Sequence, residues 1–111
     1  MDYYVIAERE IVLGFSLAGV KGQAVSSRRD ALEAFMVQTG QTSGLRSSVE
    51  TDRPKVLILT EDVSDMISSE VMDWQMKGKA PLIVEIPGLG GHIKGRKTLT
   101  DSIREAVGIN V

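Results

Sequence analysis

Short apolar runs alternate with helical patterns along this chain. Residues 3–7, 56–59 and 82–86 are apolar and rich in β-forming side chains, so they predict three strands, and residues 23–25 predict a weaker fourth. Within these runs the apolar residues are continuous rather than alternating, which is typical of parallel strands that are buried on both faces. The runs therefore predict a sheet with helices on each side.

Between the runs, apolar residues recur at helical spacing. Residues 11–18 predict a first helix that ends at Gly19, because glycine readily adopts the left-handed conformation that follows a helix. Residues 27–39 predict a second helix, and Gly40 follows it as a stop signal. After residue 98 a last helix is predicted by four apolar residues that share one face, namely Leu99, Ile103, Ala106 and Val107.

The clearest helical pattern lies between the strands at 56–59 and 82–86. Asp62 is placed to cap the first backbone N–H groups of this helix, and Gly78 ends it. A single continuous helix is expected, with one apolar stripe formed by Val63, Met66, Ile67, Val71 and Trp74.

The predicted order of elements is β-α-β-α-β-α-β-α, which implies an α/β fold with right-handed crossovers between parallel strands. We expect a flavodoxin-like or receiver-like sheet, truncated to four parallel strands, with helices on both faces. Residues 1–88 form the predicted core domain, and residues 89–111 form a glycine-rich connector and a loosely linked C-terminal helix. Residues 41–55 lack any period and predict a long loop, with an extra helical turn around 45–49 as the alternative.

Composition narrows the function classes. The 111 residues suit one domain, and a net charge of −2 argues against a protein that coats nucleic acid. The chain has no cysteine, which excludes disulfides and thiolate metal sites, and its single histidine, His92, cannot build a multi-histidine metal site. The first residues show neither a secretion signal nor a membrane span, so a cytoplasmic protein is expected. No cofactor or metal is expected either.

The stretch PGLGGHIKGRKT, residues 87–98, resembles a phosphate-binding loop in its setting between a strand and a helix. Gly90 and Gly95 have the correct gap, but Arg96 stands where such a loop has its lysine, and Lys97-Thr98 comes one residue late. A flexible connector with solvated basic residues is the favoured interpretation. The alternative is a small nucleotide-binding enzyme that uses residues 90–98.

Acidic residues follow the first and third predicted strands, as in a receiver domain that takes a phosphoryl group. These residues are Glu8, Glu10, Glu61 and Asp62. A receiver also has a fifth strand followed by a lysine, whereas Pro87-Gly88 follows the last predicted strand here. Helix N-termini favour acidic residues because of the helix dipole, which explains the same positions without chemistry. A receiver-like phospho-acceptor signalling domain remains the alternative function.

Several stretches resemble one family along nearly the whole chain. VLGFSLAGV, residues 12–20, resembles the "VLGFRLAGV" segment of the F subunit of V-type and archaeal A-type rotary ATPases. Residues 57–63 resemble that family's third strand and the start of its third helix, residues 81–88 its closing strand, and residues 103–109 its tail helix. The 41–55 loop looks like an insertion, and Gly90-Gly91-His92 is richer in glycine than the family pattern.

The resemblance implies a non-catalytic subunit of the central stalk that neither binds nor cleaves ATP. Such a subunit binds the long helical coiled coil of the D subunit inside the catalytic headpiece. It helps couple ATP hydrolysis or synthesis to proton or sodium transport. It has no catalytic, cofactor or metal residues, binds no nucleic acid, and is peripheral to the membrane.

Coiled-coil partners usually meet an apolar patch with a polar rim. Phe15, Met66 and Met72 are the candidate partner contacts, with core packing as the alternative for each. Gly14 costs its helix about 1 kcal/mol relative to Ala. This cost favours a close approach of the helix either to the sheet or to a partner, with a merely tolerated glycine as the alternative.

Overall fold

The computed structural model describes residues 2–41 and 53–91. Strands and helices alternate along these residues as the sequence predicts. In chain order the elements are β1 (Tyr3–Ala7), α1 (Arg9–Leu17), β2 (Lys21–Ala24), α2 (Arg28–Gln38), β3 (Val56–Thr60), α3 (Glu61–Met66), α4 (Ser68–Lys77) and β4 (Leu82–Ile86).

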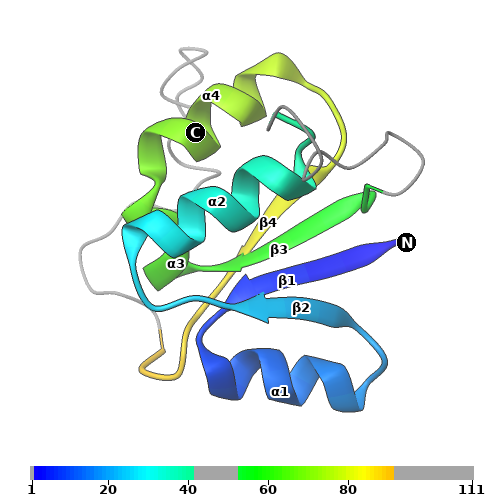
Figure 1. Cartoon of the computed structure of the whole chain (residues 1–111), viewed down its shortest axis with the longest axis vertical. Coiled ribbons are helices and arrows are strands. Elements are labelled where there is room, and N and C mark those ends of the chain that lie inside the picture. The colour runs from blue at the N-terminus through cyan, green and yellow to red at the C-terminus, as the bar shows by residue number, and fades with distance from the viewer. Residues whose placement is uncertain (1, 42–52, 92–111) are drawn as a thin grey trace, which may run out of the picture.

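The four strands form one parallel sheet in the order β2-β1-β3-β4 (Figure 1). This confirms the predicted four-stranded parallel sheet, although the weak strand β2 begins two residues earlier than its apolar residues indicated. Val5 pairs with Gly22 on one side and with Ile58 on the other, and Ile58 pairs with Val84. Because paired residues in parallel strands point to the same face, these four residues share one face of the sheet.

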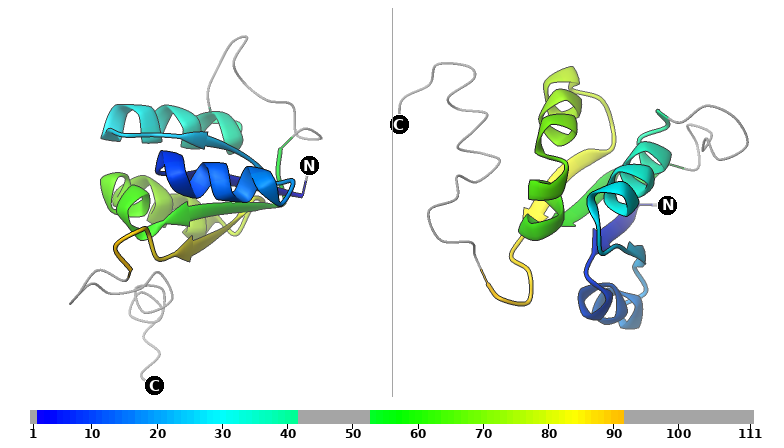
Figure 2. Two further views of the ribbon diagram at one scale, coloured as in Figure 1. Left: turned by 90° about the horizontal axis from the view of Figure 1, so that it is seen from below. Right: turned by 60° about the vertical axis from the view of Figure 1, so that its left-hand side comes forward.

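The helices cover the two faces of the sheet unequally. Helix α1 packs on β1 and β2, and it lies on one side of the sheet while α2, α3 and α4 lie on the other (Figures 1 and 2). Viewed from below, α1 stands alone on its side, and none of the described helices covers β3 and β4 there (Figure 2, left). Helices occur on both faces, as predicted, but half of one face has no helical layer within the described residues.

The dry core lies between the sheet and α2, α3 and α4. Ile6, Leu57 and Leu59 point into it from the strands and are fully buried. Trp74 of α4 is also buried in this core, and its indole Nε1–H donates to the Pro81 carbonyl oxygen at 3.0 Å. The other members of this cluster are Val25, Ala31, Ala34, Phe35, Val63, Ile67, Val71 and Ile83.

The predicted helix ends before Gly19 and Gly40 are confirmed, although α1 begins at Arg9, two residues earlier than predicted. Ser27 caps α2 by accepting from the Asp30 backbone N–H at 3.2 Å. Gly19 and Gly40 follow α1 and α2 with φ of 85° and 70°, and Gly78 follows α4 with φ of 66°. These left-handed conformations favour glycine, which is why all three stop signals were visible in the sequence.

The prediction of one continuous third helix is wrong. The chain leaves helical geometry at Ile67, where φ is −129° and ψ is 37°, and separates α3 from α4. Thr60, not Asp62, caps α3, because its hydroxyl oxygen accepts from the Val63 N–H at 3.4 Å. The β-branched Ile67 and the two serines after it are weak helix formers, so the break costs little there.

The expectation that the strands are buried on both faces is wrong for β4. Ile83 is buried, but its neighbours Leu82 and Val84 point to the α1 side and are exposed. A continuous apolar run shows that the side chains on both faces of a strand are apolar. It does not show that other elements of the fold cover both faces.

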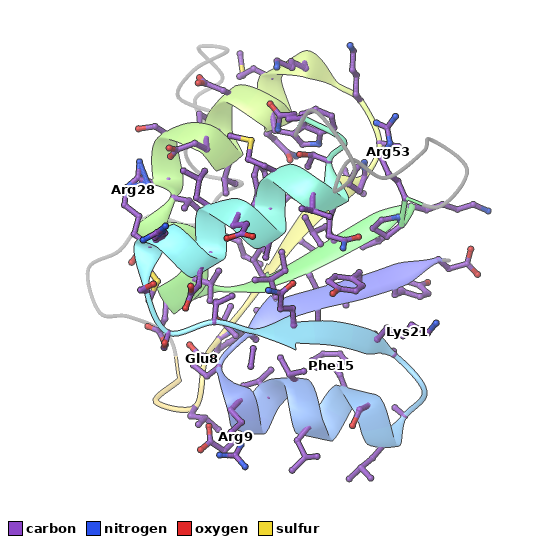
Figure 3. The ribbon with its side chains drawn as sticks, in the orientation of Figure 1. Glu8, Arg9, Phe15, Lys21, Arg28 and Arg53 are labelled. Atoms are coloured by element: carbon purple, nitrogen blue, oxygen red, sulfur yellow. The ribbon has the colours of Figure 1, made fainter. Side chains whose placement is uncertain are left out.

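Residues 42–52 and 92–111 lie outside the described residues, and so do the predicted turn at 45–49 and the predicted C-terminal helix. The two residues that flank 42–52 both bond to Thr39. Gln41 Nε2 donates to the Thr39 hydroxyl at 2.7 Å, and Arg53 Nη1 donates to the Thr39 carbonyl oxygen at 3.2 Å. Gln41 and Arg53 are therefore held at one point of the fold, at the C-terminal end of α2 (Figure 3).

Candidate protein interface

Helix α1 lies on the surface and buries none of its nine residues. Its outer face carries Leu13 and Leu17, which are 62% and 85% exposed. Large apolar side chains with this exposure are unfavourable in water when they cluster, because covering each of them contributes roughly 1.5–3 kcal/mol. The outer face of α1 is thus suited to contact another apolar surface.

Few polar side chains on α1 can interact with water. Residues 11–20 carry no charged side chain. Their one polar side chain, Ser16, donates its hydroxyl to the Leu13 carbonyl oxygen at 2.6 Å, so it bonds its own helix. Charged side chains normally coat the solvent face of a surface helix, and α1 carries them only at its N-terminal end, as Arg9 and Glu10.

The inner side of α1 packs closely on the first two strands. Phe15 projects from α1 toward β2 (Figure 3) and is half-buried. A Cβ atom on Gly22 would clash with the Cγ1 atom and the carbonyl oxygen of Val5, and would lie 3.3 Å from Val12 Cγ1 of α1. Gly22 therefore lets β1, β2 and α1 approach one another, and this packing fixes the position of α1.

On the same side of the sheet as α1, the half that has no helical layer also carries apolar side chains. Leu82 is 56% exposed, and Val84 on the same strand is also exposed. Val56, Ile58 and Ile86 face the same side and are only half-buried. We call Leu13, Leu17 and these five strand residues the α1-side surface. Exposed apolar side chains on one side of a protein favour an interaction site there.

The structure does not bring the three predicted contacts together. Phe15 belongs to the α1 side of the sheet, where it supports the helix from beneath. Met66 is half-buried against the dry core on the opposite side, and Met72 is half-buried on α4. Sequence reasoning missed Leu13 and Leu17. The signal was present, because apolar residues at 11, 13, 15 and 17 cannot all face one side of a helix.

Two of the four acidic residues lie together at the carboxyl end of the sheet, because Glu8 and Asp62 line one pocket and both lie near Gly88. Glu8 Oε1 accepts from the Thr60 hydroxyl at 3.1 Å, and a Cβ on Gly88 would lie 2.5 Å from Asp62 Oδ2. Glu10 is exposed in the first turn of α1, whereas Glu61 is buried in the first turn of α3. No group of three or more His, Asp or Glu residues is placed to hold a metal ion within residues 2–41 and 53–91.

The glycine-rich stretch is described only at its start. Gly91 has a φ of 81°, and its N–H donates to the Gly88 carbonyl oxygen at 3.0 Å, which closes a turn directly after β4. Residues 92–98, with His92, Arg96 and the Lys97-Thr98 pair, lie outside the described residues. None of the helices in the described part of the chain is long and apolar enough to cross a bilayer.

Residues 4–107 match the profile of the family described as ATP synthase (F/14-kDa) subunit. The chain belongs to this family. The sequence is 31% identical to the F subunit of the A-type ATP synthase of Pyrococcus furiosus over 113 residues, which cover 100% of this chain and 98% of that relative.

Two further relatives agree with this assignment. The F subunit of the A-type ATP synthase of Thermococcus kodakarensis is 26% identical over 111 residues, which cover 100% of this chain and 98% of that protein. The corresponding protein of Thermoplasma acidophilum is 24% identical over 107 residues, which cover 96% of this chain and 91% of the relative. The ATP synthase F-subunit family thus spans the whole α/β fold, and the chain is a subunit of an A/V-type rotary ATPase.

Proposed function

We propose that this chain is a non-catalytic subunit of the central stalk, bound to the coiled-coil D subunit of the same ATPase. The α1-side surface is the observation that carries the proposal. A family member works inside a complex, and this surface carries exposed apolar side chains on α1 and β4 that no described helix covers.

The opposite side of the sheet supports a mechanical role. There the core is fully packed, and the ion pair between Arg28 Nη2 of α2 and Glu70 Oε2 of α4, at 2.8 Å, links two of the helices that cover it. A packed interior resists deformation, so a force applied to one face is carried through the domain. In this proposal the subunit moves with the stalk as a rigid body.

Catalysis and coupling belong to other parts of the complex in this proposal. The headpiece subunits hydrolyse or make ATP on the cytoplasmic side, and membrane subunits move protons or sodium ions. The present subunit stabilises the coiled coil that connects them. Glu8 and Asp62 line one pocket at the carboxyl end of the sheet, and in this proposal they serve the fold, as the hydrogen bond from the Thr60 hydroxyl to Glu8 supports.

The test is binding to the D subunit that is encoded with this chain. The two purified full-length chains should elute together from gel filtration as a one-to-one complex. Calorimetry of the isolated chain with Mg-ATP should give no heat of binding, and incubation with acetyl phosphate should leave its mass unchanged. Separate elution of the two chains, or phosphorylation near Asp62, would contradict the proposal.

A further inference from the structure

Gly14 lies in the middle of α1 and faces away from the sheet. A Cβ atom built on Gly14 would meet no heavy atom within 4 Å, and the residue is exposed. Gly22 of β2 differs from Gly14, because a Cβ atom there would clash with Val5. The described fold therefore requires glycine at position 22 but not at position 14.

Glycine at an exposed helix interior is costly. It has the lowest helix propensity of any residue except proline, so alanine at position 14 would stabilise the isolated helix. The structure excludes a close approach to the sheet and leaves either a merely tolerated glycine or an approach from outside. The exposed apolar side chains beside Gly14 favour the second, in which the bare backbone of α1 meets another chain.

The residues around Gly14 fit such a contact. Leu13 precedes it and Leu17 lies one turn further on, so two large apolar side chains stand beside the bare backbone. Charged residues occur only at the ends of this patch, with Arg9 and Glu10 before it and Lys21 after it. An apolar centre with a charged rim is the usual anatomy of a protein interface.

We propose that the outer face of α1 is the docking site for one helix of the coiled-coil partner, and that this helix crosses α1 at Gly14. This inference rests on the proposed function and names the surface that carries it. The distance between two packed helices depends on the side chains at their crossing point, so glycine there allows the closest approach. The matching segment of the partner carries aliphatic residues over about two turns, because α1 offers them an uncharged surface of that length.

The test uses two substitutions that are harmless to the described fold. Gly14→Ala and Gly14→Leu point into open space in the free chain, so both variants should fold. Gly14→Ala should raise the Tm of the isolated chain by about 4 °C, because it removes the helix penalty of glycine. The same variant should bind the D subunit about tenfold more weakly, and Gly14→Leu about 100-fold more weakly, because added side-chain atoms force the two helices apart.

The control is Ser69→Ala, an exposed position on α4 at the opposite side of the sheet. This variant should leave the affinity for the D subunit unchanged. A gain in thermal stability combined with a loss of affinity is a signature that a merely structural role of Gly14 would not produce.

Other outcomes overturn the inference in distinguishable ways. If Gly14→Leu binds the D subunit as tightly as the natural chain, the contact lies elsewhere, and Leu82→Ser on β4 would then weaken binding instead. If Gly14→Leu lowers the Tm of the free monomer, a segment of this same chain covers α1. If the free chain is a dimer that Gly14→Leu dissociates, the occupant is a second copy. Failure of the natural chain to bind the D subunit refutes the proposed function itself.

Discussion

The side of the sheet that α2, α3 and α4 cover differs from the α1 side in how it treats apolar residues. On the first side Ile6, Leu57 and Leu59 are completely buried. On the second, Leu17 and Leu82 remain more than half exposed, although both are as apolar as the core residues. The two sides of one sheet thus carry similar side chains in different environments.

This difference separates folding from assembly. Burial of the first side stabilises the domain by itself, since its contacts form within one chain. In the proposed complex the α1 side would bury its apolar side chains against the partner, so their contribution would appear in the complex rather than in the free chain. Substitutions on the two sides should therefore affect different measurements.

The largest expected effect on stability comes from Phe35→Ala in α2. Phe35 is fully buried in the dry core, so its truncation leaves a cavity and should cost about 3–5 kcal/mol of unfolding free energy. Urea denaturation followed by circular dichroism measures this. The matched substitution on the other side, Leu17→Ala, should change stability by no more than about 0.5 kcal/mol. Similar losses from both variants would abolish the distinction between the sides.

A smaller loss is expected from Gly22→Ala, which tests the one place where the α1 side is tightly packed. The new methyl group would clash with the Val5 carbonyl oxygen, so the backbone must shift, at a cost of about 1–3 kcal/mol. Gly90→Ala is the control, because a Cβ there meets nothing within 4 Å. Equal unfolding midpoints for the two variants would show that α1 is not held in place by this contact.

Tyr4 gives a pH-dependent test of the covered side. Burial raises the pKa of the Tyr4 phenol above its ordinary value of 10.0, since the charged form is poorly solvated there. The unfolded chain therefore loses this proton first, and stability should fall as the pH rises from about 10 toward the folded-state pKa. Unfolding curves recorded across this range would show the decline. In Tyr4→Phe the part of the decline due to this group should disappear; an unchanged slope would contradict the assignment.

The smallest change in stability is expected from Leu82→Ser. The matched control is the same substitution at the neighbouring residue, Ile83. Leu82 and Ile83 are adjacent on β4 but face opposite sides. Leu82→Ser should change the unfolding free energy by about 0.5 kcal/mol or less. Ile83→Ser should cost about 3 kcal/mol or more, because it places an unpaired hydroxyl in the core. A large loss from Leu82→Ser would mean that the free chain itself covers this face.

Much of the fold could be predicted because its signals are local. The run at residues 3–7 marks β1, and Ser27 and Gly40 bracket α2 with a cap and a stop. The break at Ile67 could not be predicted, since Ile67 continues the apolar stripe and only tertiary packing decides that the backbone leaves the helix there.

The candidate interface was harder to predict than the fold. The sequence placed Phe15 on the correct helix, but it treated Leu13 and Leu17 as ordinary helix residues. An apolar side chain suits a core and an interface equally well, so its type alone does not say which one covers it. The decision depends on how far the described helices extend over β3 and β4, a property of the whole sheet. Gly14 shows the same dependence, because two kinds of close approach explained it until the structure excluded one.

The pairing of Gln41 and Arg53 with Thr39 has a practical consequence for watching this subunit at work. Because Arg53 also holds the Thr39 carbonyl oxygen, this point stays anchored when the exposed Gln41 is replaced by a residue that carries a probe. The protein has no cysteine, so a single engineered thiol there would take up one fluorophore only. If the subunit sits on the central stalk as proposed, single-molecule fluorescence from such a label would follow the rotation of the stalk in the assembled ATPase.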